Sequence, residues 1–142
     1  SFCFFNGQLL VGDYRYGRIY ELDKDAYTDG GDIVRWLRST AVQDSEGNRV
    51  FYQSFELDIE AGTGLNDGQG SDPLVMLRWS DDGGHRWSNT KYMPIGKIGQ
   101  YGRRAKREQL GAGRNRVWEI SGTDPVKISI MGAMLRLTAS DR

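Results

Sequence analysis

The segment LRWSDDGGHRWSN, residues 77–89, gathers the side chains in this sequence that are best suited to chemistry. Trp79 and Trp87 flank two aspartates, two glycines and the only histidine of the chain, His85. Three interpretations are open: a catalytic pocket, a cation-binding loop and a rigid turn. Histidine is the most frequent general base, carboxylates and loop carbonyls hold calcium, and glycine permits the backbone of tight turns.

The spacing Ser80-x-Asp82-x-Gly84-x-x-Trp87 favours the rigid turn. It matches the Asp-box pattern, in which Ser and Asp side chains bond to the turn backbone and glycine takes a φ that a Cβ disfavours. We expect the ring of Trp87 to pack under this turn. A calcium loop on Asp81 and Asp82 is the sharper alternative, although the acidic ligand of an EF-hand is missing. We predict no catalytic residue and no metal ligand here.

Composition narrows the chemistry further. The single cysteine, Cys3, allows neither an intrachain disulfide nor a cysteine zinc site. His85 alone would have to serve any Ser-His-Asp or Cys-His mechanism, and a solvent-facing turn is the simpler place for it. No run of 18 apolar residues predicts a membrane span. Lys and Arg number 19, as do Asp and Glu, so net charge gives no argument for nucleic acid or membrane.

The elements that must position this segment indicate an all-β fold of antiparallel sheets. Nineteen glycines and three prolines punctuate short aromatic and β-branched runs. Asn6-Gly7 predicts a tight hairpin, because both residues accept positive φ. Residues 18–22 alternate with period two, as in a half-buried strand. Residues 32–40 fit a strand or a short helix, and their Val, Ile and Trp favour the strand.

The remainder of the chain continues in the same way. Residues 41–60 predict a hairpin around 45–48, followed by a strand in which Phe51, Gln53, Phe55, Leu57 and Ile59 share a face or pair across it. The glycine-rich segment 61–73 predicts a long loop. Further strands are expected at residues 74–79, 87–92, 117–121 and 126–140.

We divide the chain into two regions. Residues 1–40 resemble a terminal β-propeller blade, and residues 41–142 form a β-rich C-terminal region with the Asp-box hairpin and a basic segment. The expected architecture is therefore propeller-blade-like or β-sandwich-like. Because the chain begins in a strand-like run without methionine, we expect a fragment of a longer protein or a processed chain.

The basic segment is the second candidate site. Only Glu108 opposes its cations, which are Lys97, Arg103, Arg104, Lys106, Arg107, Arg114 and Arg116. Contact with DNA phosphates, with Tyr101 stacking on bases, is one interpretation. A solvated or subunit-facing surface that pairs with acidic loops such as 23–32 is the other. We favour subunit pairing, and the two are compatible in a ring whose lumen carries DNA.

Four motifs occur together in the second half of the chain: Leu77–Trp87, Gly96-Lys97-Ile98-Gly99, Leu110-Gly111-x-x-Arg114-x-Arg116-Val117 and Asp124-Pro125-Val126. With them, residues 54–133 resemble the C-terminal part of the packaged-DNA stabilisation proteins of short-tailed bacteriophages. These are tail accessory proteins, also described as nozzle or tail hub proteins. Residues 103–109 depart from the resemblance, because they are more basic and less aromatic than expected.

The resemblance implies a non-enzymatic structural protein of the virion, located in the phage tail and assembled in the cytoplasm of the bacterial host. It implies a homo-oligomeric ring, expected to hold six copies, that extends the portal channel and helps to retain packaged DNA. The implied partners are the portal–adaptor complex, distal tail proteins and, without sequence specificity, double-stranded DNA. No cofactor and no membrane partner is implied.

Two other classes of function stay open. A carbohydrate-binding β module would use exposed aromatic side chains such as Trp79 or Tyr92 to stack on sugars. A sialidase-like hydrolase would need three arginines around a carboxylate and a tyrosine activated by a glutamate. Arginines and tyrosines are plentiful, but no spacing singles out such a set.

Overall fold

Strands and turns make up the whole of the described chain. The computed structural model describes residues 1–139, which form fourteen strands and no helix. The strands divide between a first unit, Ser1–Val34, and a second unit that begins at Arg35. Every strand pairing is antiparallel. The all-β class with antiparallel sheets is therefore confirmed.

The first unit contains five short strands. β1 (Phe2–Phe5), β2 (Gln8–Gly12) and β3 (Ile19–Glu21) form one sheet in that order, and β4 (Thr28–Asp29) pairs with β5 (Asp32–Ile33). The predicted hairpin is confirmed: Phe5 pairs with Gln8, and Asn6 and Gly7 have φ of 49° and 80°. Two positive φ values in a two-residue loop match the twist of the flanking strands.

No residue of the first unit is buried. The register places Phe2, Val11 and Tyr20 side by side on one face of the three-stranded sheet, and Phe4 lies opposite Leu9 on that same face. A sheet of this size needs a hydrophobic partner to be stable. The likeness of this region to a propeller blade stays a prediction.

The second unit begins earlier than we expected. β6 (Trp36–Ser39) pairs with β13 of the second unit, so the division lies between Val34 and Arg35 and not after Thr40. The ambiguous segment 32–40 supplies β5 and β6, both strands, and no helix.

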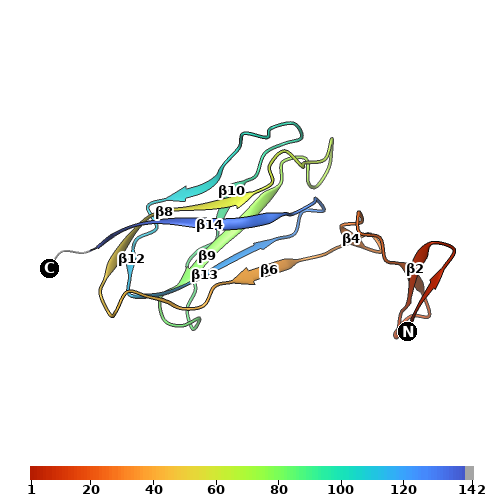
Figure 1. Cartoon of the computed structure of the whole chain (residues 1–142), viewed down its shortest axis with the longest axis horizontal. Helices are drawn as coiled ribbons and strands as arrows, with labels where there is room; N and C mark the ends of the chain where they lie inside the picture. Colours follow the sequence, from red (N-terminus) through yellow and green to blue (C-terminus); the bar gives the residue numbers. More distant parts are fainter. Residues whose placement is uncertain (140–142) are drawn as a thin grey trace. The chain divides into compact units, whose positions relative to one another are not determined.

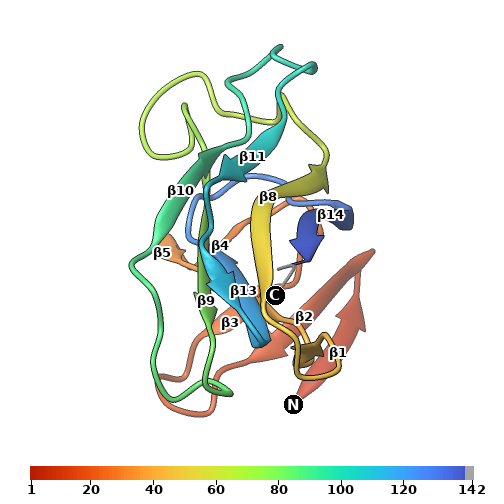
Figure 2. The same cartoon turned by 90° about the vertical axis from the view of Figure 1, so that its left-hand side faces the viewer.

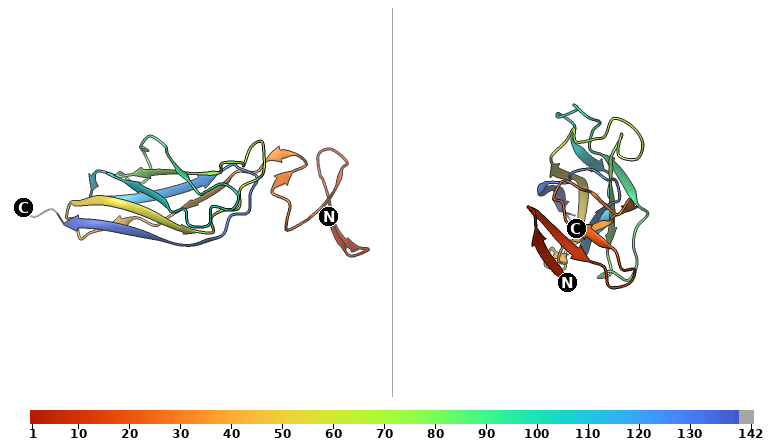
Figure 3. Two further views of the ribbon diagram at one scale, coloured as in Figure 1. Left: turned by 90° about the horizontal axis from the view of Figure 1, so that it is seen from above. Right: turned by 90° about the vertical axis from the view of Figure 1, so that its right-hand side faces the viewer.

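The second unit is a two-layer β-sandwich (Figures 1, 2 and 3). One sheet has the order β10–β9–β13–β6, and β7 also pairs with β13. Its strands are β6, β7 (Gln43–Asp44), β9 (Leu74–Ser80), β10 (Lys91–Pro94) and β13 (Asn115–Gly122). In the other sheet β8 is central, with β11 and β12 along one edge and β14 along the other. Its strands are β8 (Val50–Ile59), β11 (Ala105–Glu108), β12 (Ala112–Gly113) and β14 (Ile130–Ala139).

The core fills the space between the two sheets. Side chains of β8 meet those of β9, β10 and β13, with Trp118 of β13 at the centre. Its ring lies 5.3 Å from the rings of both Tyr52 and Phe55, measured between centroids. Packing of this kind fixes the relative position of the sheets, because core side chains interdigitate with few voids.

A β-bulge changes the face pattern that we predicted for β8. Phe55, Leu57 and Ile59 share the buried face as expected, but Phe51 and Gln53 point outward. Arg136 pairs with Ser54 and the next residue of β14 pairs with Tyr52, so Gln53 is the extra residue of the bulge. An extra residue reverses the alternation beyond it, and the prediction for residues 51 and 53 is therefore wrong.

Two predicted hairpins differ in their pairing. The turn at residues 45–48 exists, since Asn48 N donates to Ser45 O, but β7 pairs with β13 and β8 lies in the other sheet. This turn therefore carries the chain from one layer to the other. β9 and β10 do pair, although β10 begins at Lys91 and not at residue 87. The loop predicted at 61–73 contains no strand.

The two open sides of the sandwich differ. On one side the guanidinium of Arg107 on β11 donates to the carbonyl oxygen of Tyr92 on β10, from Nε at 2.9 Å and also from Nη2. This contact joins the edges of the two sheets. On the opposite side, β6 and β14 border a cavity of about 410 Å³.

The fit between β13 and β6 gives a first prediction. A Cβ at Gly122 would lie 2.5 Å from Nε1 of Trp36, whose ring packs against the core. We expect Gly122→Ala to lower the free energy of unfolding by about 1–3 kcal/mol, as overpacking does, in chemical denaturation. Gly132→Ala on β14 is the matched control, because its Cβ would meet nothing within 4 Å. Equal effects of both substitutions would contradict the close approach.

Candidate functional site

The loop after β9 contains a closed set of hydrogen bonds. The hydroxyl of Ser80 donates to Oδ1 of Asp82 at 2.7 Å and accepts from the backbone N–H of Gly84 at 2.8 Å. Asp82 Oδ1 also accepts from the N–H of Arg86 at 2.8 Å. Gly83 and Gly84 have φ of 72° and 98°, a region that L side chains rarely adopt. The four bonding residues thus fix the turn from within.

These bonds lower the pKa of Asp82 below its ordinary value. The largest cause is the hydrogen bond from the Arg86 N–H, followed by the one from the Ser80 hydroxyl. Both donors favour the ionised carboxylate. Asp82 is therefore an anion that the turn itself requires.

Trp87 lies against the turn that precedes it. A Cβ at Gly84 would be 3.7 Å from Cζ2 of the indole, so ring and turn are in contact. The ring is half-buried, and the guanidinium of Arg78 stacks on it at 4.5 Å from the centroid. Arg78 in turn forms an ion pair with Glu119 of β13. Trp87 is thereby connected to the sheet as well as to the turn.

Arg116 is the centre of the largest polar arrangement in the sandwich. Its side chain is 1% exposed. Nε donates to Oδ1 of Asp81 at 2.6 Å, and Nη2 donates to Oδ2 at 2.8 Å, a bidentate ion pair. Nη1 donates to the carbonyl oxygen of Leu110 at 2.7 Å. The guanidinium thus has hydrogen bonds in three directions from two separate segments.

Aromatic rings enclose the same guanidinium. Its carbon lies 4.1 Å from the centroid of Tyr52, 5.1 Å from that of Trp118 and 5.2 Å from that of Trp79. Stacking on ring faces stabilises a cation most where water is excluded. Burial raises the pKa of the Tyr52 hydroxyl; the charge of Arg116 opposes the rise and that of Asp81 adds to it.

Gly113 makes room for the ion pair. A Cβ at this position would lie 2.2 Å from Oδ1 of Asp81 and 3.3 Å from Nη2 of Arg116. Only glycine therefore allows the loop after β9 to approach the segment between β12 and β13. The two neighbouring aspartates have separate tasks: Asp82 closes the turn, and Asp81 binds Arg116.

The expected contact set in the basic segment is partly wrong. Arg116 is not available to DNA or to another subunit, because the core holds its charge. Arg104 pairs with Glu56 at 3.2 Å and Lys106 with Glu108 at 2.6 Å, while Arg107 joins the two sheets. Lys97, Arg103 and Arg114 are exposed and have no side-chain ion pair within residues 1–139.

These three free cations do not form one patch. Lys97 and Arg103 lie on the connection that leads into Ala105, which pairs with Leu57. Arg114 follows β12, whose residues pair with Val50 and Phe51 at the other end of β8. The sandwich therefore separates what the sequence places within twenty residues.

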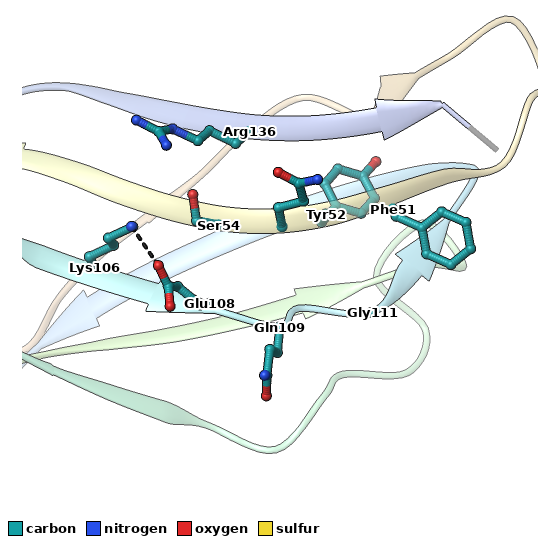
Figure 4. A pocket seen from close by; sticks show the side chains of 9 residues that line it. Phe51, Tyr52, Ser54, Lys106, Glu108, Gln109, Gly111 and Arg136 are labelled. Carbon is teal, nitrogen blue, oxygen red and sulfur yellow. Dashed lines mark hydrogen bonds and ion pairs between the residues drawn. The ribbon is translucent and has the colours of Figure 1, made fainter.

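A shallow depression of about 570 Å³ lies on the outer face of the β8 sheet (Figure 4). The Lys106–Glu108 ion pair and Arg136 line it, together with Phe51 and Gln109. It occurs where the β8 bulge and residues 109–111 interrupt the ladder between β11 and β12. Lys106 lowers the pKa of Glu108, chiefly through its hydrogen bond. The arrangement is a polar surface in which the carboxylate already has a partner.

The other interpretations find little in the described residues. Within residues 1–139, no group of three or more His, Cys, Asp or Glu side chains could hold a metal ion. His85 is exposed on the turn. Trp79 is half-buried beside Arg116, whereas Tyr92 is 51% exposed. No helix in this part of the chain could cross a bilayer.

The fold and this arrangement define a β-sandwich module whose polar centre is structural. A comparison with protein families identifies its relatives: residues 35–138 match the family described as Bacteriophage P22 Gp10, beta-sandwich. The match covers most of the chain and begins where the second unit begins, so the chain belongs to this family. Membership supports a short-tailed phage tail accessory protein with a structural role, and it suggests a non-enzymatic one. No curated protein matches the chain.

The Arg116–Asp81 pair gives a second prediction. Asp81→Ala leaves a buried guanidinium without its counter-ion, and we expect the free energy of unfolding to fall by about 3 kcal/mol. Arg116→Met removes the charge as well. We therefore expect the double variant to lose clearly less than the two single losses together, in a double-mutant cycle from urea denaturation. Additive losses would show that the pair is not coupled.

The Asp82 turn gives a third prediction. We expect Asp82→Ala to lower the melting temperature at pH 7. Because the folded-state pKa is lowered, the ionised carboxylate stabilises the fold above its unfolded pKa, and this contribution is lost as pH falls through the folded pKa. The difference in melting temperature between wild type and variant should therefore narrow below about pH 4. A difference that is constant down to pH 2.5 would exclude a role of the charge.

Proposed function

We propose that this chain is part of a tail protein that assembles as a ring, extends the portal channel and helps to retain packaged DNA. The observation that carries the proposal is the family match over residues 35–138. The proposed ring holds six copies and contacts the portal–adaptor complex and distal tail proteins. The ring is assembled in the host cytoplasm and resides in the virion tail.

The physical task of such a ring is mechanical and electrostatic. A wall around pressurised DNA must keep its shape, and the sandwich has cross-links suited to this: the caged Arg116, the Arg107 contact between sheet edges and the Asp82 turn. Rings close by heterologous contacts that repeat around an axis. The chemistry of the proposed function therefore lies in contacts between surfaces and needs no cofactor.

The free cations are the proposed contact groups of the basic segment. Lys97 and Arg103 are neighbours on one connection, since a Cβ at Gly96 would lie 3.1 Å from Cβ of Arg103. Exposed cations of this kind bind carboxylates of another subunit or phosphates of DNA without sequence preference. We favour subunit contact, which in a ring also leaves some cations facing the lumen.

The fourth prediction tests assembly. Light scattering should show that the parent protein gains the mass of a ring when the portal–adaptor complex is added. We expect the double variant Lys97→Glu/Arg103→Glu to assemble at least tenfold more weakly, because two attractive contacts become repulsive. Arg86→Glu, an exposed charge reversal on the Asp-box loop, is the matched control.

The outcomes separate the parts of the proposal. A parent protein that ignores the portal–adaptor complex would exclude the ring. Normal assembly of the double variant, with leakage of nuclease-sensitive DNA from the resulting particles, would assign Lys97 and Arg103 to DNA in place of a neighbouring subunit. Normal assembly without leakage would remove both residues from the proposed contacts.

A further inference from the structure

The side of the sandwich bordered by β6 and β14 lacks a covering element. Its cavity of about 410 Å³ reaches the core residues Phe55, Leu57 and Trp118. On β14, Ile130 and Leu137 pair with the buried Ile59 and Tyr52 and so share the core-facing side, yet they are 37% and 50% exposed. Core-facing apolar side chains that stay exposed indicate a missing partner.

Polar groups at this cavity also lack partners. Arg38 on β6 lines it, is exposed, and has no ion pair or side-chain hydrogen bond within residues 1–139. Trp118 is 1% exposed, and its indole Nε1–H has no acceptor in the same part of the chain. A buried donor without an acceptor is rare in folded proteins. The missing partner should therefore supply a carboxylate and a hydrogen-bond acceptor as well as apolar side chains.

Two strand edges face this side. β6 pairs only with β13, and β14 pairs only with β8, so each presents one row of unpaired backbone groups. Exposed edges of this kind pair with an extended strand from another chain, which adds backbone hydrogen bonds while its alternate side chains fill pockets. The geometry fits an added strand better than a small ligand.

The first unit has the matching chemistry. It carries six Asp and Glu against three Lys and Arg, whereas residues 35–142 carry thirteen against sixteen, which gives formal charges of −3 and +3. Its strand β3 pairs only with β2 and has a free edge. On and beside β3, Ile19 and Leu22 are 75% and 65% exposed, and Glu21 lies between them. The first unit is thus acidic, apolar on its surface and able to pair at an edge.

We propose that the cavity between β6 and β14 receives the first unit of a second copy of this chain. The carboxylates of that unit approach Arg38, its apolar side chains enter the cavity, and a strand edge pairs with β6 or β14. The inference rests on the proposed ring, because a contact between unlike surfaces of successive copies is the kind that generates a ring. Opposite charges on the two surfaces favour this pairing and oppose the pairing of like units.

The first experiment measures self-association of the full chain by sedimentation velocity over a range of concentrations at low salt. We expect Arg38→Glu and Ala133→Trp, which fills the cavity, to weaken association at least tenfold. Arg49→Glu is the matched control, because Arg49 is exposed and precedes the far end of β8. Circular dichroism establishes that each variant is folded, and Arg38→Glu carries the test if Ala133→Trp is not.

The second experiment identifies the occupant. A photo-crosslinking benzophenone amino acid replaces Ser39 at the cavity, and ¹⁵N-labelled chain is mixed with unlabelled chain before irradiation. Peptide masses then show whether a cross-link joins two copies or lies within one. We expect mixed-label cross-links from position 39 to residues 1–34.

Each outcome decides. Cross-links only within one chain, or to residues beyond 34, would overturn the proposal. So would unchanged association of both variants, although the ring would then stand on a different contact. A chain that stays monomeric at about 100 μM overturns the self-contact, while recruitment to the portal–adaptor complex still decides the proposed function separately.

Discussion

A guanidinium without water is the group on which the rest of the sandwich depends. Burying a charge is costly unless it is paired and fully hydrogen-bonded, and Arg116 meets this condition only when three segments are in place. Asp81 comes from the loop after β9, the carbonyl of Leu110 from the connection after β11, and the stacking ring of Tyr52 from β8. The ion pair therefore couples both sheets to one loop, and a displacement of any of these segments leaves a charge unpaired.

This constraint explains why the Asp-box loop has its sequence. Ser80 and Asp82 give the turn its shape, and the shape presents Asp81 to Arg116 across Gly113. Trp87 then stacks on Arg78, which pairs with Glu119 on the neighbouring strand. The loop is thus a brace between β9 and β13. A loop whose carboxylates are held in this way has a structural task that accounts for every residue of its pattern.

The sequence predicted the fold class better than the site. Periodicity and turn chemistry indicated the strands, the Asn6-Gly7 hairpin and the 61–73 loop, because these depend on neighbouring residues. The β8 bulge was missed, since it depends on pairing with β14. Arg116 was assigned to the surface because composition counts charges without placing them. A signal for its burial was present: residues two apart on a strand share a face, and Trp118 follows Arg116 at that distance.

The neutral composition conceals a second feature of the same kind. A chain with no net charge gives no argument for an electrostatic partner, yet its two units carry −3 and +3. The acidic unit buries no residue of its own, and the basic unit has one side that Arg107 closes and one side that no element covers. Each unit therefore lacks what the other offers. When copies are arranged around an axis, that complementarity between unlike surfaces is satisfied by the next copy, and the closed side remains free to face a different neighbour.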